Sequence, residues 1–310
     1  MENLELRERE IKWTGKGQSL SVLEICGNKI IIGFNTGRIE IYDSRNGTDL
    51  QCETVLAYWN RGSSVTCLVC TCAELIVGYA DGSISIWDIQ SRHLRKKIVE
   101  PDFSHNGPGY ATSMRMKGET LVVGTNKGTV RAWQYANGSI ISLGQWKQAQ
   151  SSIISVDFNG TYVALNTSGA LYVCYQNGQS LPWRIPTPVS HLSLTLHEDY
   201  VITGHYTASY QSLLQVFNMR TGDMLNTLTG GRTQSISTAV QGSCILSGES
   251  NGGIFIWNLE DVLTGASVTP RVMVDPVNSG VSGYEFLRFG RNMFVRYSTR
   301  LSSVKVFDFK

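Results

Sequence analysis

Residues 75–88 read LIVGYADGSISIWD and have the pattern of a β-hairpin. The segment Leu75–Val77 consists of strand-forming residues, and in Ser83–Ile86 serine alternates with isoleucine, as a strand with one buried face requires. Between them, Asp81-Gly82 is a pair that can adopt the positive φ of a tight turn. The stretch therefore predicts two antiparallel strands, the second of which ends at Trp87-Asp88.

The same hairpin recurs along the chain, usually with a glycine before the turn and an aromatic residue near the end of the second strand. This column of residues is Tyr42, Trp87, Trp133, Cys174, Phe217, Trp257 and Phe307, which are about 40 to 50 residues apart. Seven units in register, with a hairpin that ends in Trp-Asp, are the signature of propeller blades. At these residues, and over essentially its full length, the chain resembles the WD-repeat β-propeller family.

The resemblance implies an all-β fold, a seven-bladed β-propeller of four-stranded antiparallel blades. We expect one domain, residues 1–310, with blades that begin near residues 19, 64, 110, 152, 188, 235 and 279. The last unit ends at Lys310 and contains only three of its four strands. In the family the N-terminal segment supplies the missing outer strand, so residues 4–13 are expected to close the ring within a lead-in of residues 1–18.

The chain also departs from the family pattern. The usual Gly-His pair is missing before every first strand, and Gly204-His205 lies inside a hairpin. The family's His–Asp–Ser–Trp hydrogen-bond network therefore cannot form in its usual way, although Asp81 and Trp87 remain. We expect more apolar packing and fewer buried polar networks. The short first turns resemble the propellers of F-box-type substrate receptors.

Composition restricts the function classes. The 27 Lys and Arg against 25 Asp and Glu argue against a polyanion-binding surface spread over the whole protein. A charged N-terminus and the lack of a long apolar run predict an intracellular protein, cytoplasmic or nuclear, with no membrane span. The seven cysteines are odd in number and lie mostly in strand-like segments, which predicts reduced thiols.

A partner-binding face is predicted where the hairpin turns and blade entrances meet, because aromatic and arginine side chains gather there in the sequence. Such side chains dominate protein recognition. The candidates are Phe34, Tyr79, Tyr110, His205, Tyr206, Tyr210, Arg296, Tyr297 and Arg61. The alternative interpretation is that several of them pack between blades or shield the mouth of the channel.

Other motifs are weaker. A basic patch of Arg92, Arg95, Lys96 and Lys97 could bind nucleic acid or an acidic partner, or could simply protect an outer strand from edge pairing. Residues 67–72 contain three cysteines, but strand geometry divides them between two faces and no further ligands are near, so no metal is expected. No catalytic motif is recognisable.

The sequence thus predicts a non-catalytic scaffold that binds peptide segments or protein partners within a multi-subunit complex, without a cofactor. Substrate recognition in a ubiquitin ligase is one option, although nothing in residues 1–18 resembles an F-box. The competing classes are an RNA-binding or DNA-binding propeller that uses basic loops and, less favoured, an enzyme with a site at the channel mouth.

Overall fold

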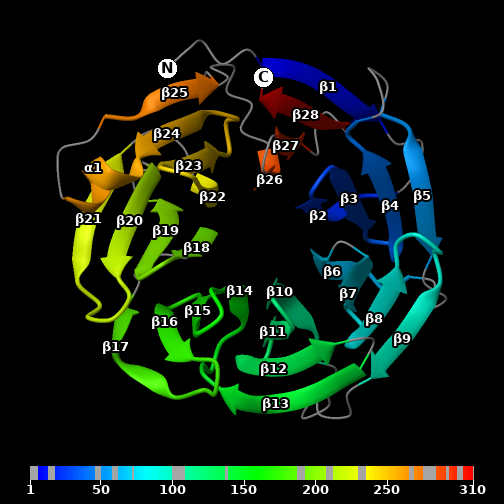
Figure 1. Cartoon of the computed structure of the whole chain (residues 1–310), viewed down its shortest axis with the longest axis horizontal. Coiled ribbons are helices and arrows are strands. Elements are labelled where there is room, and N and C mark those ends of the chain that lie inside the picture. Colours follow the sequence, from blue (N-terminus) through cyan, green and yellow to red (C-terminus); the bar gives the residue numbers. More distant parts are fainter. Residues whose placement is uncertain are drawn as a thin grey trace. The chain divides into compact units, whose positions relative to one another are not determined.

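A computed structural model describes residues 6–12, 18–45, 50–57, 62–71, 73–99, 109–136, 139–186, 193–206, 212–229, 235–264, 269–274, 284–290, 293–298 and 303–309. These residues form seven four-stranded antiparallel sheets and one short helix. Each sheet is a blade of the propeller class, so the prediction of an all-β fold with seven four-stranded blades is confirmed (Figure 1). The chain divides into two compact units, residues 1–110 with 283–310, and residues 111–282.

The first unit contains three blades. They are β2 (Leu20–Cys26), β3 (Lys29–Phe34), β4 (Arg38–Asp43) and β5 (Cys52–Ala57); β6 (Val65–Cys70), β7 (Glu74–Tyr79), β8 (Ser83–Asp88) and β9 (Leu94–Val99); and β26 (Tyr284–Phe289), β27 (Met293–Ser298), β28 (Ser303–Phe309) with β1 (Leu6–Lys12). The hairpin that opened the sequence analysis is β7–β8, and its turn residue Gly82 has the positive φ, 85°, that the pattern required.

The second unit contains four blades. They are β10 (Ala111–Lys117), β11 (Thr120–Thr125), β12 (Thr129–Ala136) and β13 (Ser139–Lys147); β14 (Ile153–Phe158), β15 (Tyr162–Thr167), β16 (Ala170–Tyr175) and β17 (Ser180–Pro186); β18 (Ser193–His197), β19 (Tyr200–Tyr206), β20 (Ser212–Asn218) and β21 (Met224–Thr229); and β22 (Ser235–Gln241), β23 (Cys244–Glu249), β24 (Ile254–Asn258) and β25 (Arg271–Val274). The helix α1 (Leu259–Leu263) joins β24 to β25.

The N-terminal strand completes the last blade, as the resemblance implied. β1 pairs antiparallel with β28 over seven residue pairs, from Leu6 with Phe309 to Lys12 with Ser303 (Figure 1). Its Ile11 side chain is fully buried, and the buried Arg9 donates to Asp308 and to the Ser44 carbonyl at 2.5 Å. The same strand is thus fixed both to its own blade and to the β2–β5 blade.

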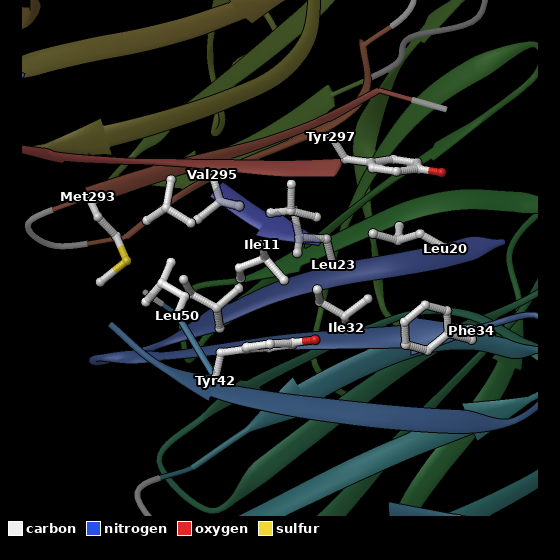
Figure 2. Close-up of a cluster of buried hydrophobic side chains, with 13 residues drawn as sticks. Ile11, Leu20, Leu23, Ile32, Phe34, Tyr42, Leu50, Met293, Val295 and Tyr297 are labelled. Carbon is white, nitrogen blue, oxygen red and sulfur yellow. The ribbon is translucent and has the colours of Figure 1, made fainter. Parts of the chain in front are cut away.

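The core of the first unit is apolar and lies between blades. Figure 2 shows Ile11 among Leu23, Ile32 and Val295, side chains that come from β1, β2, β3 and β27. All four are completely buried. Burial of a side chain of this size contributes about 1.5–3 kcal/mol, so neighbouring blades stabilise one another mainly through such contacts.

In three blades, the Asp or Asn that directly follows the aromatic residue of the repeat caps the next turn with its side chain. Asp43 accepts a hydrogen bond from the Arg45 amide at 2.8 Å, and Asp88 accepts one from the Ser91 amide at 2.7 Å. Asn218 plays the same part for the Arg220 amide at 2.9 Å. Hydrogen bonds to the Ser91 amide and to the Arg95 guanidinium lower the pKa of Asp88 to about 2. The Asp of the Trp-Asp signature is therefore a turn-capping residue in this chain.

A partly buried carboxylate links three blades of the second unit. Arg115 Nε of β10 lies 3.4 Å from Asp157 Oδ1 of β14, and Asp157 Oδ2 accepts from the Leu196 amide of β18 at 2.7 Å. Burial raises the pKa of Asp157, because the charged form loses its hydration, while Arg115 and the amides favour the charged form. Removal of this carboxylate would leave Arg115 without its partner across the blade boundary.

A disulfide joins two blades of the first unit. Cys26 at the end of β2 and Cys70 at the end of β6 are bonded, with their Cα atoms 6.1 Å apart. The prediction of reduced thiols is therefore wrong at these two positions, because the ends of the two first strands lie close enough to be bridged. Cys52, Cys67, Cys174 and Cys244 are thiols outside any disulfide, as predicted, and Cys72 lies outside the described residues. Burial raises the pKa of the Cys174 thiol to about 12.

Among the described residues, no helix has the length and apolar character needed to span a membrane.

Candidate partner-binding surfaces

Three aromatic residues of the predicted face lie inside the protein. Phe34 and Tyr297 belong to the core of the first unit, where Figure 2 shows them with Leu20, and Tyr79 belongs to the neighbouring core between β2–β5 and β6–β9. Phe34 and Tyr79 are fully buried and Tyr297 is 2% exposed. This corrects the expectation of exposed side chains at these positions and favours the alternative interpretation, packing between blades.

Tyr79 has a specific structural role. The Trp87 indole Nε1 donates to Ser85 Oγ at 2.7 Å, and Ser85 Oγ donates to the Tyr79 phenol oxygen at 3.1 Å. This chain of hydrogen bonds is a buried polar network that forms without a histidine, in a chain for which the sequence predicted fewer such networks. Asp81 accepts hydrogen bonds from the Ser83 amide and hydroxyl at the adjacent turn.

The Tyr79 network makes a testable prediction about stability. Tyr79→Phe should lower the free energy of unfolding by about 1–3 kcal/mol, because the buried Ser85 hydroxyl loses its acceptor while the ring packing is kept. Tyr79→Ala should cost about 3–5 kcal/mol, because it also leaves a cavity. Urea unfolding of the two variants measures both. Equal stability of wild type and Tyr79→Phe would show that the hydrogen bond contributes nothing.

His205 and Arg296 are also largely buried. Burial lowers the pKa of His205, which disfavours its charged form. The guanidinium carbon of Arg296 lies 4.8 Å from the centre of the Phe307 ring, a cation–π contact within the last blade. Two more predicted side chains are therefore engaged inside the blades.

Four of the predicted residues remain. Tyr110 is half-buried at the entrance to β10. Arg61 and Tyr210 lie outside the described residues, and Tyr206 ends β19 with its side chain not described. A partner-binding role at these four positions stays a prediction.

The basic patch is exposed on the outer strand β9 and the turn before it, as predicted. Arg95 is not a free cation, because it forms ion pairs with Glu74 at 2.9 Å and with Asp88. The Arg92 side chain donates to the Glu53 carbonyl of β5 at 3.2 Å. These contacts favour the structural interpretation of Arg92 and Arg95, whereas Lys96 and Lys97 are exposed at the strand edge.

A surface cluster that the sequence analysis missed lies at the other end of the strands, in the second unit. The rings of Tyr162, which begins β15, and Tyr175, which ends β16, lie with their centres 4.9 Å apart. Both tyrosines are half-exposed. A hydrogen bond between the two phenols and partial burial raise the pKa of Tyr162 above its ordinary value.

An arginine from the next blade completes this aromatic–arginine cluster. Arg220 follows β20, and its guanidinium pairs with Asp199 at 3.1 Å and interacts electrostatically with both phenols. Its backbone is held by the Asn218 cap and by the Met219 amide, which donates to the Asp199 carbonyl at 2.7 Å. The cluster thus brings together two half-exposed phenol rings, from β15 and β16, and an exposed guanidinium on the turn after β20.

The equivalent residue pairs in the other six blades show what is unusual about Tyr162 and Tyr175. The residues paired across this strand end are Lys29 with Asp43, Glu74 with Asp88, Thr120 with Gln134, Tyr200 with Asn218, Cys244 with Asn258 and Met293 with Asp308. Only the β14–β17 blade has two aromatic residues, because Tyr175 replaces the capping Asp or Asn. That break in the repeat is the sequence signal by which the cluster could have been found.

Among the described residues, no group of three or more His, Cys, Asp or Glu side chains is arranged to hold a metal ion.

Comparison with known proteins gives distant relatives. No family model matches the chain. The Periodic tryptophan protein 2 homolog of Caenorhabditis elegans is 22% identical over 273 residues, which cover 80% of this chain. The matched part is 28% of that protein, so the chain spans well under half of the relative's length.

Solved structures show the same fold. A chain in the crystal structure of the Mitotic Checkpoint Complex aligns with a TM-score of 0.77 at 13% identity, covering 97% of this chain and 90% of that one. The computationally designed Ika8 protein aligns with a TM-score of 0.68 at 20% identity, covering 93% and 83%. With the seven blades and their repeats, these likenesses confirm the resemblance to the WD-repeat β-propellers.

Proposed function

We propose that this protein is a non-catalytic scaffold that binds segments of protein partners through the aromatic–arginine cluster of Tyr162, Tyr175 and Arg220. The carrying observation is that two half-exposed tyrosine rings lie against each other at this strand end in one blade only, where Tyr175 takes the place of a capping Asp or Asn. The fold does not need an aromatic pair there, since six other blades form the same strand end without one.

The chemistry of the cluster suits a protein segment. Tyrosine offers a large rigid surface with a polar end, and tyrosine and arginine are enriched at the residues that dominate binding energy. Arg220 already pairs with Asp199, so the cluster carries no large excess charge. A segment with an apolar or aromatic anchor and a hydrogen-bonding backbone would fit it better than a polyanion. We place the scaffold's role in substrate recognition or complex assembly.

Quantitative affinity capture from cell lysate tests this function. We expect the Tyr162→Ala/Tyr175→Ala/Arg220→Ala variant to lose partners that the wild type retains, by tenfold or more, because hot-spot truncations cost about 2 kcal/mol or more each. The matched control is Thr120→Ala/Gln134→Ala, which changes the same strand end in the β10–β13 blade.

The outcomes separate the competing interpretations. If both variants retain a partner that Tyr110→Ala loses, the binding site lies on the face predicted from the sequence and not at the cluster. Nucleic acid that is recovered at low salt, released by added salt and unaffected by the cluster variant would instead favour binding at Lys96 and Lys97.

A further inference from the structure

The turns that hold the aromatic–arginine cluster carry more negative than positive charge. These turns are residues 159–162, 175–179, 197–200 and 218–223. Their charged side chains are the carboxylates of Glu198, Asp199 and Asp223 and the guanidinium of Arg220. Arg220 is paired with Asp199 at 3.1 Å. Glu198 and Asp223 are exposed, and neither carboxylate has an ion pair or hydrogen bond with another described residue.

The Glu198 turn lies beside the two tyrosines. The side-chain amide of Asn159, in the neighbouring blade, donates to the Glu198 carbonyl at 3.1 Å. The side-chain oxygen of the same Asn159 accepts a hydrogen bond from the Tyr162 amide at 2.9 Å. The charges of Asp199 and Arg220 both act on the Tyr162 phenol. Exposed negative charge and half-exposed aromatic surface are therefore neighbours at this end of the strands.

Glu198 stands at a backbone position where the repeat uses glycine. In three other blades the two-residue turn between the first and second strands begins with Gly27, Gly118 or Gly242, whose φ angles are 58°, 56° and 55°. Glu198 begins the equivalent turn of the β18–β21 blade with a φ of 49°. A residue with a Cβ is strained in this region, so the turn itself does not favour glutamate here.

We propose that the protein segment bound at the cluster carries a lysine or arginine beside its anchor, and that this basic side chain lies between Glu198 and the ring of Tyr162. The inference rests on the function proposed above and adds the chemical class of the partner, a basic segment. A cation is attracted both by a carboxylate and by the face of a tyrosine ring. An acidic segment would instead meet Glu198 and Asp223 as like charges. Arg220 does not reverse this preference, because Asp199 pairs with it.

Selection from a displayed library of random peptides tests the class of the partner. The wild type is the target, and Tyr162→Ala/Tyr175→Ala is used for counter-selection, so that only peptides that need the tyrosines are kept. We expect these peptides to be enriched in Lys and Arg and depleted of Asp and Glu relative to the library. Tyrosine-dependent peptides without that enrichment would overturn the basic segment but leave the proposed function in place. If no peptide depends on the tyrosines, both fail.

Variants of Glu198 test its contact with the basic side chain. The probe is a synthetic copy of the most enriched peptide, and fluorescence anisotropy measures its affinity at low and moderate salt. Glu198→Gly should weaken binding about fivefold and reduce its salt dependence, because one exposed charge pair is lost. Its melting temperature should equal or exceed that of the wild type, since glycine suits a φ of 49°. Glu198→Lys should weaken binding about tenfold or more, because like charges then face each other.

The matched control is Glu119→Gln, which removes a carboxylate from the equivalent turn of the β10–β13 blade and should bind the peptide as the wild type does. Replacement of the peptide's basic residue by alanine completes a double-mutant cycle, and it should weaken binding less in Glu198→Gly than in the wild type. Equal effects in the two backgrounds would overturn the contact with Glu198. So would a loss of affinity in Glu119→Gln as large as that in Glu198→Gly.

Discussion

Removal of residues 1–12 is expected to unfold at least the first unit of the protein. The deletion takes away the β1–β28 ladder, the buried Ile11 side chain and the Arg9 contacts with Asp308 and Ser44. Loss of a buried isoleucine costs about 2–5 kcal/mol, and loss of the part-buried Arg9–Asp308 ion pair, the Arg9–Ser44 hydrogen bond and the strand ladder adds to this cost. Their sum is comparable with the whole stability of a typical domain.

Point variants on β1 distinguish the contribution of side-chain packing from that of the strand as a whole. Ile11→Ala should lower the free energy of unfolding by about 2–5 kcal/mol. Glu8→Gln on the same strand should change it by less than about 1 kcal/mol, since Glu8 pairs with Lys305 at the surface. Circular dichroism during thermal and urea unfolding measures these effects. A shortened chain that melts like the full one would show that β1 is dispensable.

Loss of the Cys26–Cys70 disulfide is the second large expected effect. The bridge closes a loop of 44 residues between the ends of β2 and β6. In the chain-entropy description, a loop of this length stabilises the folded state by about 4 kcal/mol. Cys26→Ser/Cys70→Ser should therefore unfold at clearly lower urea concentration than the oxidised wild type, and a reductant should shift the wild type toward the variant.

The control for the disulfide is Cys52→Ser, because Cys52 is an exposed free thiol. Its unfolding midpoint should match the wild type with and without reductant. Alkylation followed by peptide mapping should find Cys26 and Cys70 protected before reduction and modified after it. Modification of both thiols in the unreduced folded protein would contradict the bridge.

The fold could be predicted from the sequence because its determinants are local. Strand alternation, an Asp-Gly turn and a recurring aromatic residue define each hairpin, and seven hairpins in register define the blade number. The place of the N-terminal strand was implied by the resemblance to the WD-repeat family, since the last unit contains only three of its four strands. The burial of Phe34, Tyr79 and Tyr297 could not be predicted, since it depends on which blade packs behind each strand end.

Two features were within reach of the sequence but needed the repeats to be aligned column by column. Cys26 and Cys70 end the first strands of consecutive units, so one repeat separates them and neighbouring blades bring them together. Tyr175 stands in the column that Asp43 and Asp88 occupy elsewhere. Counting cysteines does not reveal the Cys26–Cys70 pair, and searching the hairpin turns for aromatic residues does not reveal Tyr175.

Hydrogen exchange of the complex with a captured partner tests the central claim, that the aromatic–arginine cluster binds partners, most directly. The account predicts that the partner slows exchange of the backbone amides in Gln176–Gln179 and Arg220–Asp223, which flank Tyr175 and Arg220. It predicts no change at Asn35–Arg38, in the hairpin turn of the face predicted from the sequence. Protection at Asn35–Arg38 or around Tyr110, with none at the cluster, would contradict it.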